Sequence, residues 1–410
     1  MNTIRIFTFG CKVNQYDSQI FREFFLKKGY QITDSQQYDI AFINTCCVTI
    51  KAQNECKKTI KKLLSKGKKV WVSGCMVEKE NISNIFPECI LMPRQVLFEQ
   101  ALGGGIKTIS SFCGHSRAFI KVVDGCENHC SYCIVPFVRG KIRSRRIADI
   151  REEIIGLINK FFCEFVITGI DLGAYGKDIG VSLKDLIKEI SPIQGLKRLR
   201  LSSIELFHIS DGLLDVLRSC ENFCPSFHIP IQSGSSAILK MMGRSYTKEN
   251  FTDCIKHIRS IWNNATITTD IMIGFPGETD MDFSDTLSVI EECEFLKVHL
   301  FPFSLHKQTS AAKRAFQISE KEKNLRMRQA FVKATDVAIS VKKGFIGKRL
   351  PVFVEKKMNG LWFGYSNNYI PFLIDTESNL KGKIVNVVGE ELVFIGEQTY
   401  LLSKEFSILP

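Results

Sequence analysis

Strand-like apolar runs alternate with helix-like segments through most of this 410-residue chain, and that alternation limits the folds open to it. Near the N-terminus the runs are IRIFTFG (4–10), YDIAFIN (38–44) and KKVWVSG (68–74). Helical periods follow the first two, near Ser18–Lys28 and Ala52–Leu64. Strands that alternate with helices pair in parallel. We therefore expect residues 1–105 to form a doubly wound parallel sheet.

A second alternating region covers residues 112–342. Its strand-like runs lie at 119–125, 165–170, 198–204, 226–232, 266–275 and 295–303. Units of this kind, six in a row, fit a partial (β/α)6 barrel better than a full eight-unit barrel. A long basic helix, roughly 320–342, ends the region, and the glycines at 103–105 indicate a linker before it.

From Gly344 the pattern changes to short strands separated by turns. That texture is typical of a small all-β barrel, which we expect over residues 344–410. The expected fold class is therefore α/β: a doubly wound N-terminal sheet, a central partial barrel and a small C-terminal all-β barrel.

The distribution of charge points to a polyanionic partner. The net charge is +12, and the basic residues are concentrated on both sides of a nearly neutral central region. RNA is such a partner. The N-terminus lacks the layout of a secretory signal, and no stretch approaches the roughly 18 apolar residues that cross a bilayer. We expect a cytoplasmic protein with no membrane association.

In reducing cytosol, the 15 cysteines are more readily explained by metal binding or catalysis than by disulfides. An isolated free cysteine usually acts as a small buried hydrophobe. We expect that role for eight of them: Cys56, Cys89, Cys113, Cys163, Cys220, Cys224, Cys254 and Cys293. The others are grouped.

Three grouped cysteines follow the first strand of the central region. DGCENHCSYC places Cys126, Cys130 and Cys133 in C-x3-C-x2-C spacing, at the strand end where barrel enzymes carry their active sites. Three thiolates on one loop can hold three irons of a [4Fe–4S] cluster and leave the fourth iron open to a small molecule. A zinc site that recruits His129 is the alternative.

The N-terminal region repeats this arrangement with distant cysteines. Cys11, Cys46 and Cys75 each follow one of the three strands, so they should converge at one edge of the sheet, beside Gly10 and Gly74. We expect a second cubane with an open iron. Three independent buried thiols are the alternative, and Cys47 competes with Cys46 for the middle position.

Longer motifs now identify a resemblance. The C-x3-C-x2-C loop resembles that of the radical S-adenosylmethionine (SAM) superfamily. The chain resembles its methylthiotransferase family almost end to end, in TFGCKVNQYDS, INTCCVT, VSGCMVE, VDGCENHCSYCIVPFVRGKIRSR, LRLSSIE, HIPIQSGS, MMGRSYT and TDIMIGFPGETDMDF. GCKVNQYDS is similar to the branch that acts on N6-threonylcarbamoyladenosine in tRNA, rather than to the isopentenyladenosine branch. The C-terminal region resembles the RNA-binding TRAM domain.

The resemblance implies two [4Fe–4S] clusters, SAM, an electron donor and the anticodon stem-loop of tRNA. Cys11, Cys46 and Cys75 would ligate the auxiliary cluster, and Cys126, Cys130 and Cys133 the radical SAM cluster. One SAM would methylate a sulfur associated with the auxiliary cluster. A second would give the radical that takes hydrogen from carbon 2 of the modified adenine, where methylthio is then installed.

Further candidate residues are expected to contact SAM. Tyr132 adjoins Cys133, and Arg244 lies in GRSY, where it would meet SAM or the RNA. The remaining candidates follow successive strands: Thr168, Gly169, Ser202, Glu205, Gln232 and Gly274. For Glu205 a structural salt bridge is an equal alternative. Arg139, Lys141, Arg143, Arg145 and Arg146 suit phosphates or the SAM carboxylate, with ion pairs as the alternative.

The sequence departs from the family pattern at two places that matter. Cys47 stands where relatives tend to have threonine, and FPFSLHKQTSAAK lacks the arginine, glycine and final proline of the family's loop. His306, Lys307 and Gln308 occupy that loop, which bears on substrate choice. Alternatives to the tRNA reading are another nucleoside, a ribosomal-protein aspartate, or a non-enzymatic iron–sulfur protein that binds RNA.

Overall fold

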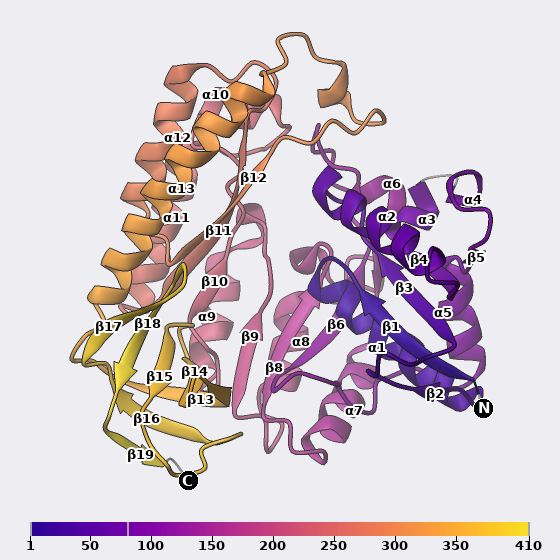
Figure 1. The fold of residues 1–410 in the computed structure, drawn as a ribbon. Helices are drawn as coiled ribbons and strands as arrows, with labels where there is room; N and C mark the ends of the chain where they lie inside the picture. The colour runs from indigo at the N-terminus through magenta and orange to yellow at the C-terminus, as the bar shows by residue number, and fades with distance from the viewer. Residues whose placement is uncertain (1, 80–81, 409–410) are drawn as a thin grey trace. The chain divides into compact units, whose positions relative to one another are not determined.

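The computed structural model describes residues 2–79 and 82–408. The chain divides into two compact units, drawn mainly in indigo to magenta and in pink to yellow in Figure 1. The first comprises Met1–Leu196 with Ser304–Ala312, and the second comprises Lys197–Phe303 with Lys313–Pro410. Buried ion pairs such as Lys121 with Asp17 join the N-terminal sheet to the start of the second region. The three-domain boundaries stay a prediction.

The N-terminal sheet is parallel throughout. Its strands are β1 (Thr3–Thr8), β2 (Gln31–Ile32), β3 (Ile40–Thr45), β4 (Lys69–Gly74) and β5 (Ile90–Leu91). They lie in the order β2-β1-β3-β4-β5. This is a doubly wound order in which the chain changes direction between β1 and β3, so the predicted sheet is confirmed. The sequence did not reveal the short strands β2 and β5.

Five helices accompany this sheet in the described residues: α1 (Lys12–Lys27), α2 (Ile50–Leu64), α3 (Cys75–Lys79), α4 (Ile82–Ile85) and α5 (Arg94–Gly103). Helix α1 begins at Lys12 instead of near Ser18, because Val13 and Tyr16 already belong to its buried face. The rings of Phe25 and Phe42 meet edge to face at 5.0 Å between α1 and β3. Most lysines of helix α2 are exposed, and Lys57 is half-buried.

The first unit also contains the start of the second alternating region. Its elements are β6 (Ala118–Asp124), α6 (Val135–Arg139), β7 (Arg143–Ser144), α7 (Ile147–Ile158), β8 (Glu164–Gly169), the 3-10 turn Leu172–Ala174 and α8 (Leu183–Ile190). Strand β6 pairs in parallel with β8 and antiparallel with β7. The carboxyl ends of β6 and β8 therefore point the same way.

The second unit continues the alternation. It contains β9 (Arg198–Leu201), the 3-10 turn Leu206–His208, α9 (Asp211–Ser219), β10 (Ser226–His228), α10 (Ser236–Met241), α11 (Lys248–Ile261), β11 (Thr266–Ile273), α12 (Asp280–Glu292), β12 (Lys297–Pro302) and α13 (Glu320–Lys343). Strands β10, β11 and β12 form a parallel sheet. The predicted α/β alternation is confirmed, and closure into a partial barrel stays a prediction.

A largely antiparallel sheet follows α13. Its strands are β13 (Arg349–Met358), β14 (Leu361–Ser366), β15 (Pro371–Ile374), β16 (Ile384–Val388), β17 (Glu391–Ile395), β18 (Gln398–Ser403) and β19 (Phe406–Ile408), in the order β17-β18-β15-β14-β13-β16-β19. Only β15 and β18 pair in parallel among the register pairs described. The C-terminal β region is thus confirmed, whereas its closure as a barrel is not tested.

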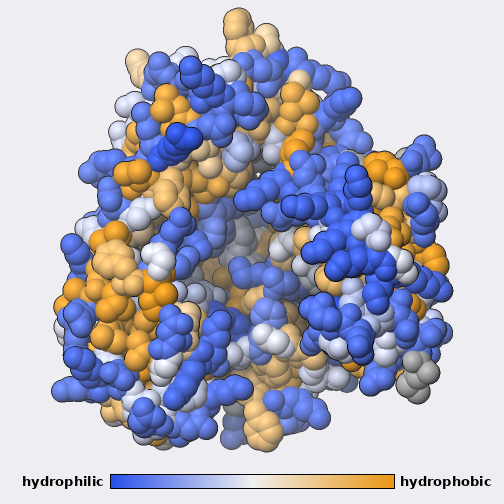
Figure 2. All heavy atoms as spheres, in the orientation of Figure 1, coloured by the Kyte–Doolittle hydropathy of each residue, from blue (hydrophilic) through white to orange (hydrophobic). Residues whose placement is uncertain are grey.

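The aromatic residues of this sheet are mostly internal, as the sequence predicted. Trp362, Phe363 and Phe372 are buried, while Tyr365 and Tyr369 are partly exposed. Figure 2 shows hydrophobic surface where Figure 1 draws β17 and β18, and Phe394 of β17 is 64% exposed. Among the described helices, none combines the length and apolar character that a membrane crossing requires.

Candidate cluster sites

The structure brings Cys11, Cys46 and Cys75 to one edge of the N-terminal sheet. Cys11 caps the start of α1, Cys46 follows β3, and Cys75 opens α3. The register pairs Thr8 of β1 with Asn44 of β3, so the first two cysteines flank the point where the strand order reverses. Crevices at such points are the usual ligand sites of doubly wound sheets.

Two glycines allow these cysteines to approach one another. Gly10 and Gly74 both have φ of +92°, a left-handed conformation that favours glycine. A Cβ on Gly10 would lie 2.8 Å from the sulfur of Cys46, and one on Gly74 would lie 2.5 Å from the backbone of Thr45. Both glycines therefore have the close packing that the sequence predicted.

Charge interactions connect the three thiols. Burial raises the pKa of the Cys46 thiol to about 12, and the neighbouring Cys75 and Cys11 raise it further. A hydrogen bond from Cys47 lowers the pKa of the Cys75 thiol to about 6, and the Arg139 guanidinium, whose Nε donates to the Cys75 sulfur at 3.2 Å, lowers it too. A lowered pKa favours the thiolate, which is the form of cysteine that binds iron.

Cys46 and Cys47 have different surroundings. Cys46 interacts with both Cys11 and Cys75, whereas the Cys47 thiol is fully buried and donates to the Cys75 carbonyl at 3.4 Å. A hydrogen bond with the Cys75 side chain, together with burial, raises the pKa of the Cys47 thiol well above its usual value. Both thiols interact with Cys75, so the choice of Cys46 over Cys47 as the third ligand stays a prediction. Cys56, which the sequence predicted only as buried, accepts from the Cys46 amide at 3.5 Å.

The second trio lies on the loop between β6 and α6. Gly125, with φ of +81°, turns the chain directly before Cys126, and a Cβ there would collide with the Lys141 carbonyl. The amides of Asn128 and Val135 donate to the sulfurs of Cys126 and Cys133, at 3.5 and 3.4 Å. Backbone N–H groups aimed at cysteine sulfur stabilise thiolates, as iron–sulfur sites require. All three cysteines are half-buried.

Sequence reasoning missed two residues beside this loop. The Asn128 amide nitrogen donates to Asp171 at 2.9 Å, and the Asp171 carboxylate lies 3.9 Å from the Cys126 sulfur. Burial raises the pKa of Cys126 to about 12, and Asp171 raises it further. Asp171 follows β8 closely, so the strand-end rule that selected Thr168 and Gly169 should also have selected it. Thr168 is buried and Tyr132 half-buried.

No three His, Cys, Asp or Glu side chains in the described residues are arranged to hold a single metal ion. A cubane differs because it separates its cysteine sulfurs further than one ion does. Both trios fit such a group: each has three thiols in electrostatic contact, and hydrogen-bond donors that reach the sulfurs.

The candidates in the second unit fall into two kinds. The Ser202 hydroxyl and the Gln232 Oε1 are buried without a hydrogen-bond partner among the described residues, which is the state expected of groups that await a ligand. Glu205 and Arg244 instead pair at 2.6 Å, as the salt-bridge alternative predicted. The Gly274 amide donates to Glu278 at 3.0 Å, and a Cβ there would collide with Lys323.

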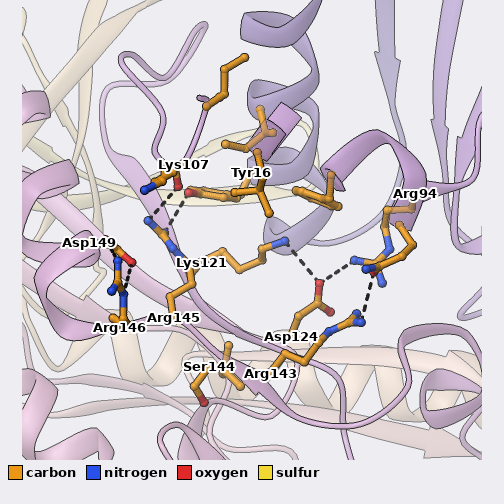
Figure 3. Close-up of a pocket in the computed structure, with 16 residues that line it drawn as sticks. Tyr16, Arg94, Lys107, Lys121, Asp124, Arg143, Ser144, Arg145, Arg146 and Asp149 are labelled. Carbon is orange, nitrogen blue, oxygen red and sulfur yellow. Dashed lines mark hydrogen bonds and ion pairs between the residues drawn. The ribbon is translucent and has the colours of Figure 1, made fainter. Parts of the chain in front are cut away.

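Three members of the basic run after Cys133 pair with carboxylates, in agreement with the ion-pair alternative, and contacts of the run with phosphate or the SAM carboxylate stay a prediction. Arg139 pairs with Asp17, Arg145 with Glu153 and Arg146 with Asp149. In Figure 3, Lys121 and Arg94 point toward Asp124 beside a cavity of about 410 Å³. The pairing of Arg139 with Asp17 joins segments far apart in the chain, which the sequence alone did not reveal, whereas Arg146 and Asp149 are near neighbours in sequence.

The loop that departs from the family pattern packs inside the first unit. His306 is buried, and its ring nitrogens lie 2.9 Å from the Val48 carbonyl and from the Lys79 amine. The Ala311 amide donates to the Ser131 carbonyl at 2.8 Å. The loop therefore contacts the segments that carry both cysteine trios, while Lys307 and Gln308 are exposed.

One of the eight cysteines expected to be buried is exposed. Cys113 lies on the loop before β6, where its sulfur is 3.6 Å from the Ser111 hydroxyl. Cys163, Cys220 and Cys254 are half-buried, and the others are buried as expected. Cys113 is exposed because its loop runs over the surface, where an isolated apolar residue carries little penalty.

Two family models match the chain. Residues 3–91 match the uncharacterized protein family UPF0004, and residues 120–290 match the radical SAM superfamily. Each match contains one cysteine trio.

Curated relatives extend over nearly the whole chain. A threonylcarbamoyladenosine tRNA methylthiotransferase MtaB of Thermotoga maritima is 37% identical over 90% of this chain and 91% of its own length. One of Chlamydia pneumoniae is 39% identical over 75% and 76%. A tRNA-2-methylthio-N(6)-dimethylallyladenosine synthase of Pelotomaculum thermopropionicum is 31% identical over 94% and 95%.

Among solved structures, the radical SAM methyltransferase TsrM of Kitasatospora setae superposes with a TM-score of 0.56. That match covers 76% of this chain and 75% of TsrM at 14% sequence identity. It shows a shared α/β radical SAM fold.

Proposed function

Because the chain belongs to the family of radical SAM tRNA methylthiotransferases, we propose that it adds a methylthio group to carbon 2 of N6-threonylcarbamoyladenosine in tRNA, next to the anticodon. The observation that carries this proposal is the match to the Thermotoga relative over 91% of that protein's length. Such a reaction would take place in the cytoplasm, where tRNA is modified.

The two cysteine trios receive separate roles. Cys126, Cys130 and Cys133 hold the radical SAM cluster, and Cys11, Cys46 and Cys75 hold the auxiliary cluster. When bound, the clusters and SAM supply the electron, the hydrogen abstraction and the methylthio group. The amides of Asn128 and Val135 hold two sulfurs of the first trio in place, and Arg139 does the same for Cys75.

We assign SAM contacts to residues that follow the strands: Tyr132, Thr168, Gly169, Ser202, Glu205, Gln232, Arg244 and Gly274. The buried and unpartnered oxygens of Ser202 and Gln232 give the most direct support among the described residues. Arg244 and Glu205 together offer one positive and one negative group, which suits the carboxylate and the amino group of SAM. An external electron donor completes the reaction.

The C-terminal sheet is proposed to bind RNA as a TRAM-like module. Tyr365 is partly exposed, and its ring lies 5.3 Å from that of Tyr369, over which the Arg200 guanidinium lies. Exposed aromatic rings near lysines stack on unpaired bases of RNA loops. Lys356 and Lys357 of the neighbouring strand β13 supply the positive charge.

The test is nucleoside mass spectrometry on tRNA incubated with SAM, a chemical reductant and reconstituted protein. tRNA that carries N6-threonylcarbamoyladenosine should gain a methylthio group in place of hydrogen, and the Cys126→Ala variant should leave it unchanged. Parallel reactions use tRNA with N6-dimethylallyladenosine and ribosomal protein. The name of the Pelotomaculum relative points to a dimethylallyl substrate. Conversion of that substrate alone would overturn the substrate assignment but keep the reaction type.

A further inference from the structure

We propose that Arg139 sets the reduction potential of the auxiliary cluster by presenting one uncompensated positive charge to Cys75. Arg139 is a positioning residue in this role, since it acts through the cysteine. The inference rests on the proposed function, because it requires a cluster at Cys11, Cys46 and Cys75.

Each nitrogen of the Arg139 guanidinium has a hydrogen-bond partner. Nε donates to the Cys75 sulfur at 3.2 Å, and Nη1 donates to Asp17 at 2.9 Å. Nη2 donates to the Asn14 side-chain oxygen. With 2% exposure, Arg139 has no bulk water to dissipate its charge, so the electrostatic effect on the sulfur is strong.

The surrounding ion pairs do not neutralise that charge. Three buried cations, Arg94, Lys121 and Arg139, share two buried carboxylates, Asp17 and Asp124. All five are at most 7% exposed, which leaves one positive charge unmatched within the group. A buried charge is costly unless a partner is present.

An oxidised cubane core held by three thiolates carries one net negative charge, which is the complement of the unmatched cation. Positive charge and hydrogen bonds to cluster sulfur favour the reduced state, since reduction adds a negative charge. Arg139 therefore raises the potential of the auxiliary cluster and makes its reduced form easier to reach.

Arg139 also belongs to the element that leaves the other trio. It is the last residue of α6, which begins two residues after Cys133, and Val138 and Ile134 pack in one apolar cluster with Cys47 and Cys75. One short helix therefore joins the radical SAM loop to the charge that acts on the auxiliary site.

The experiment isolates the auxiliary cluster in full-length protein whose Cys126, Cys130 and Cys133 are replaced by alanine. Anaerobic redox titration followed by electron paramagnetic resonance measures the midpoint potential. Arg139→Gln should keep about four irons per chain and shift the midpoint to more negative values, and Arg139→Lys should shift it less. Asp17→Asn, which removes a carboxylate from the same group, should shift the midpoint in the opposite direction.

Arg145→Gln is the matched control. Like Arg139, Arg145 forms an ion pair with a buried carboxylate, that of Glu153, but among the described residues it makes no contact with a cysteine. Its midpoint should equal that of the parent. An unchanged midpoint in Arg139→Gln with iron retained, or shifts of the same sign in Arg139→Gln and Asp17→Asn, would overturn the inference. Absence of iron in the parent itself would instead refute the auxiliary cluster of the proposed function.

Discussion

The guanidinium of Arg200 lies over the ring of Tyr369, with 3.9 Å between its central carbon and the ring centre. Arg200 is on β9 and is fully buried, and it donates to the carbonyls of Ser366 and Asn367 at 2.8 and 2.6 Å. Arg198 donates to the Tyr365 carbonyl at 3.0 Å. Two arginines of β9 thus bind the end of β14 and the turn that follows it, and so attach the C-terminal sheet to β9.

Arg200→Ala should therefore destabilise the second unit. Loss of the guanidinium leaves the Ser366 and Asn367 carbonyls without their hydrogen-bond donor, which costs about 1–3 kcal/mol of stability for each carbonyl. The melting temperature should fall by about 5 °C or more. Differential scanning fluorimetry measures it, with the exposed Arg218→Ala as control. Equal melting temperatures for the two variants would contradict the attachment role.

Gly10→Ala should remove the auxiliary cluster selectively. The added Cβ would lie 2.8 Å from the Cys46 sulfur, so the cysteine has to move. Iron analysis should show about half the iron of the parent protein, with SAM cleavage retained. Gly29→Ala is the matched control: Gly29 has a similar φ of +86°, but nothing lies within 4 Å of its Cβ position. Full iron occupancy in Gly10→Ala would contradict the proposed ligand geometry.

The two trios should divide the chemistry between them. Cys126→Ala should abolish formation of 5′-deoxyadenosine from SAM, while Cys11→Ala should retain it and lose the methylthio product. The reason is that Cys11 lies at the N-terminal sheet edge, outside the loop between β6 and α6. Chromatography of the SAM products measures the first reaction and nucleoside mass spectrometry the second. Loss of SAM cleavage in Cys11→Ala speaks against this division.

Iron and sulfide analysis checks the number of clusters. Anaerobically reconstituted protein should contain about eight irons and eight sulfides per chain, because two cubanes are proposed. Removal of iron with a chelator should abolish both SAM cleavage and methylthio transfer. About four irons would eliminate one cluster, and zinc in place of iron would eliminate the enzyme hypothesis.

Lys342 should make the stability of the second unit depend on pH. Burial lowers the pKa of the Lys342 amine to about 8, and the charge of Lys297 lowers it further. The unfolded chain therefore binds more protons between about pH 8 and 10.5, so this group destabilises the fold below pH 8 and ceases to do so as the pH rises.

Lys342→Met should consequently stabilise the protein at pH 7 by about 1 kcal/mol, a value reduced for the partial exposure of the amine. The gain should shrink toward pH 10. Urea denaturation at both pH values measures it, and the exposed neighbour Lys343→Met serves as control. A gain that is independent of pH would show that packing, and not charge, is responsible.

The sequence alone determined the α/β alternation, the parallel N-terminal sheet and the placement of both cysteine trios at strand ends. Those features follow from hydrophobic period and from spacing along the chain, which are local. It also predicted the close approach at Gly10 and Gly74. The short strands β2 and β5 were not predicted, because two residues are too few to show a hydrophobic period.

Only the tertiary structure decided which partners the charged side chains choose. Asp17 and Arg139 are separated by 122 positions, and nothing in the pattern near either residue specifies the other. It likewise brought Cys46 into interaction with Cys11 and Cys75, which are distant from it in the sequence. Pairing of buried charges depends on how distant segments approach one another, and that approach is fixed only when the whole first unit folds.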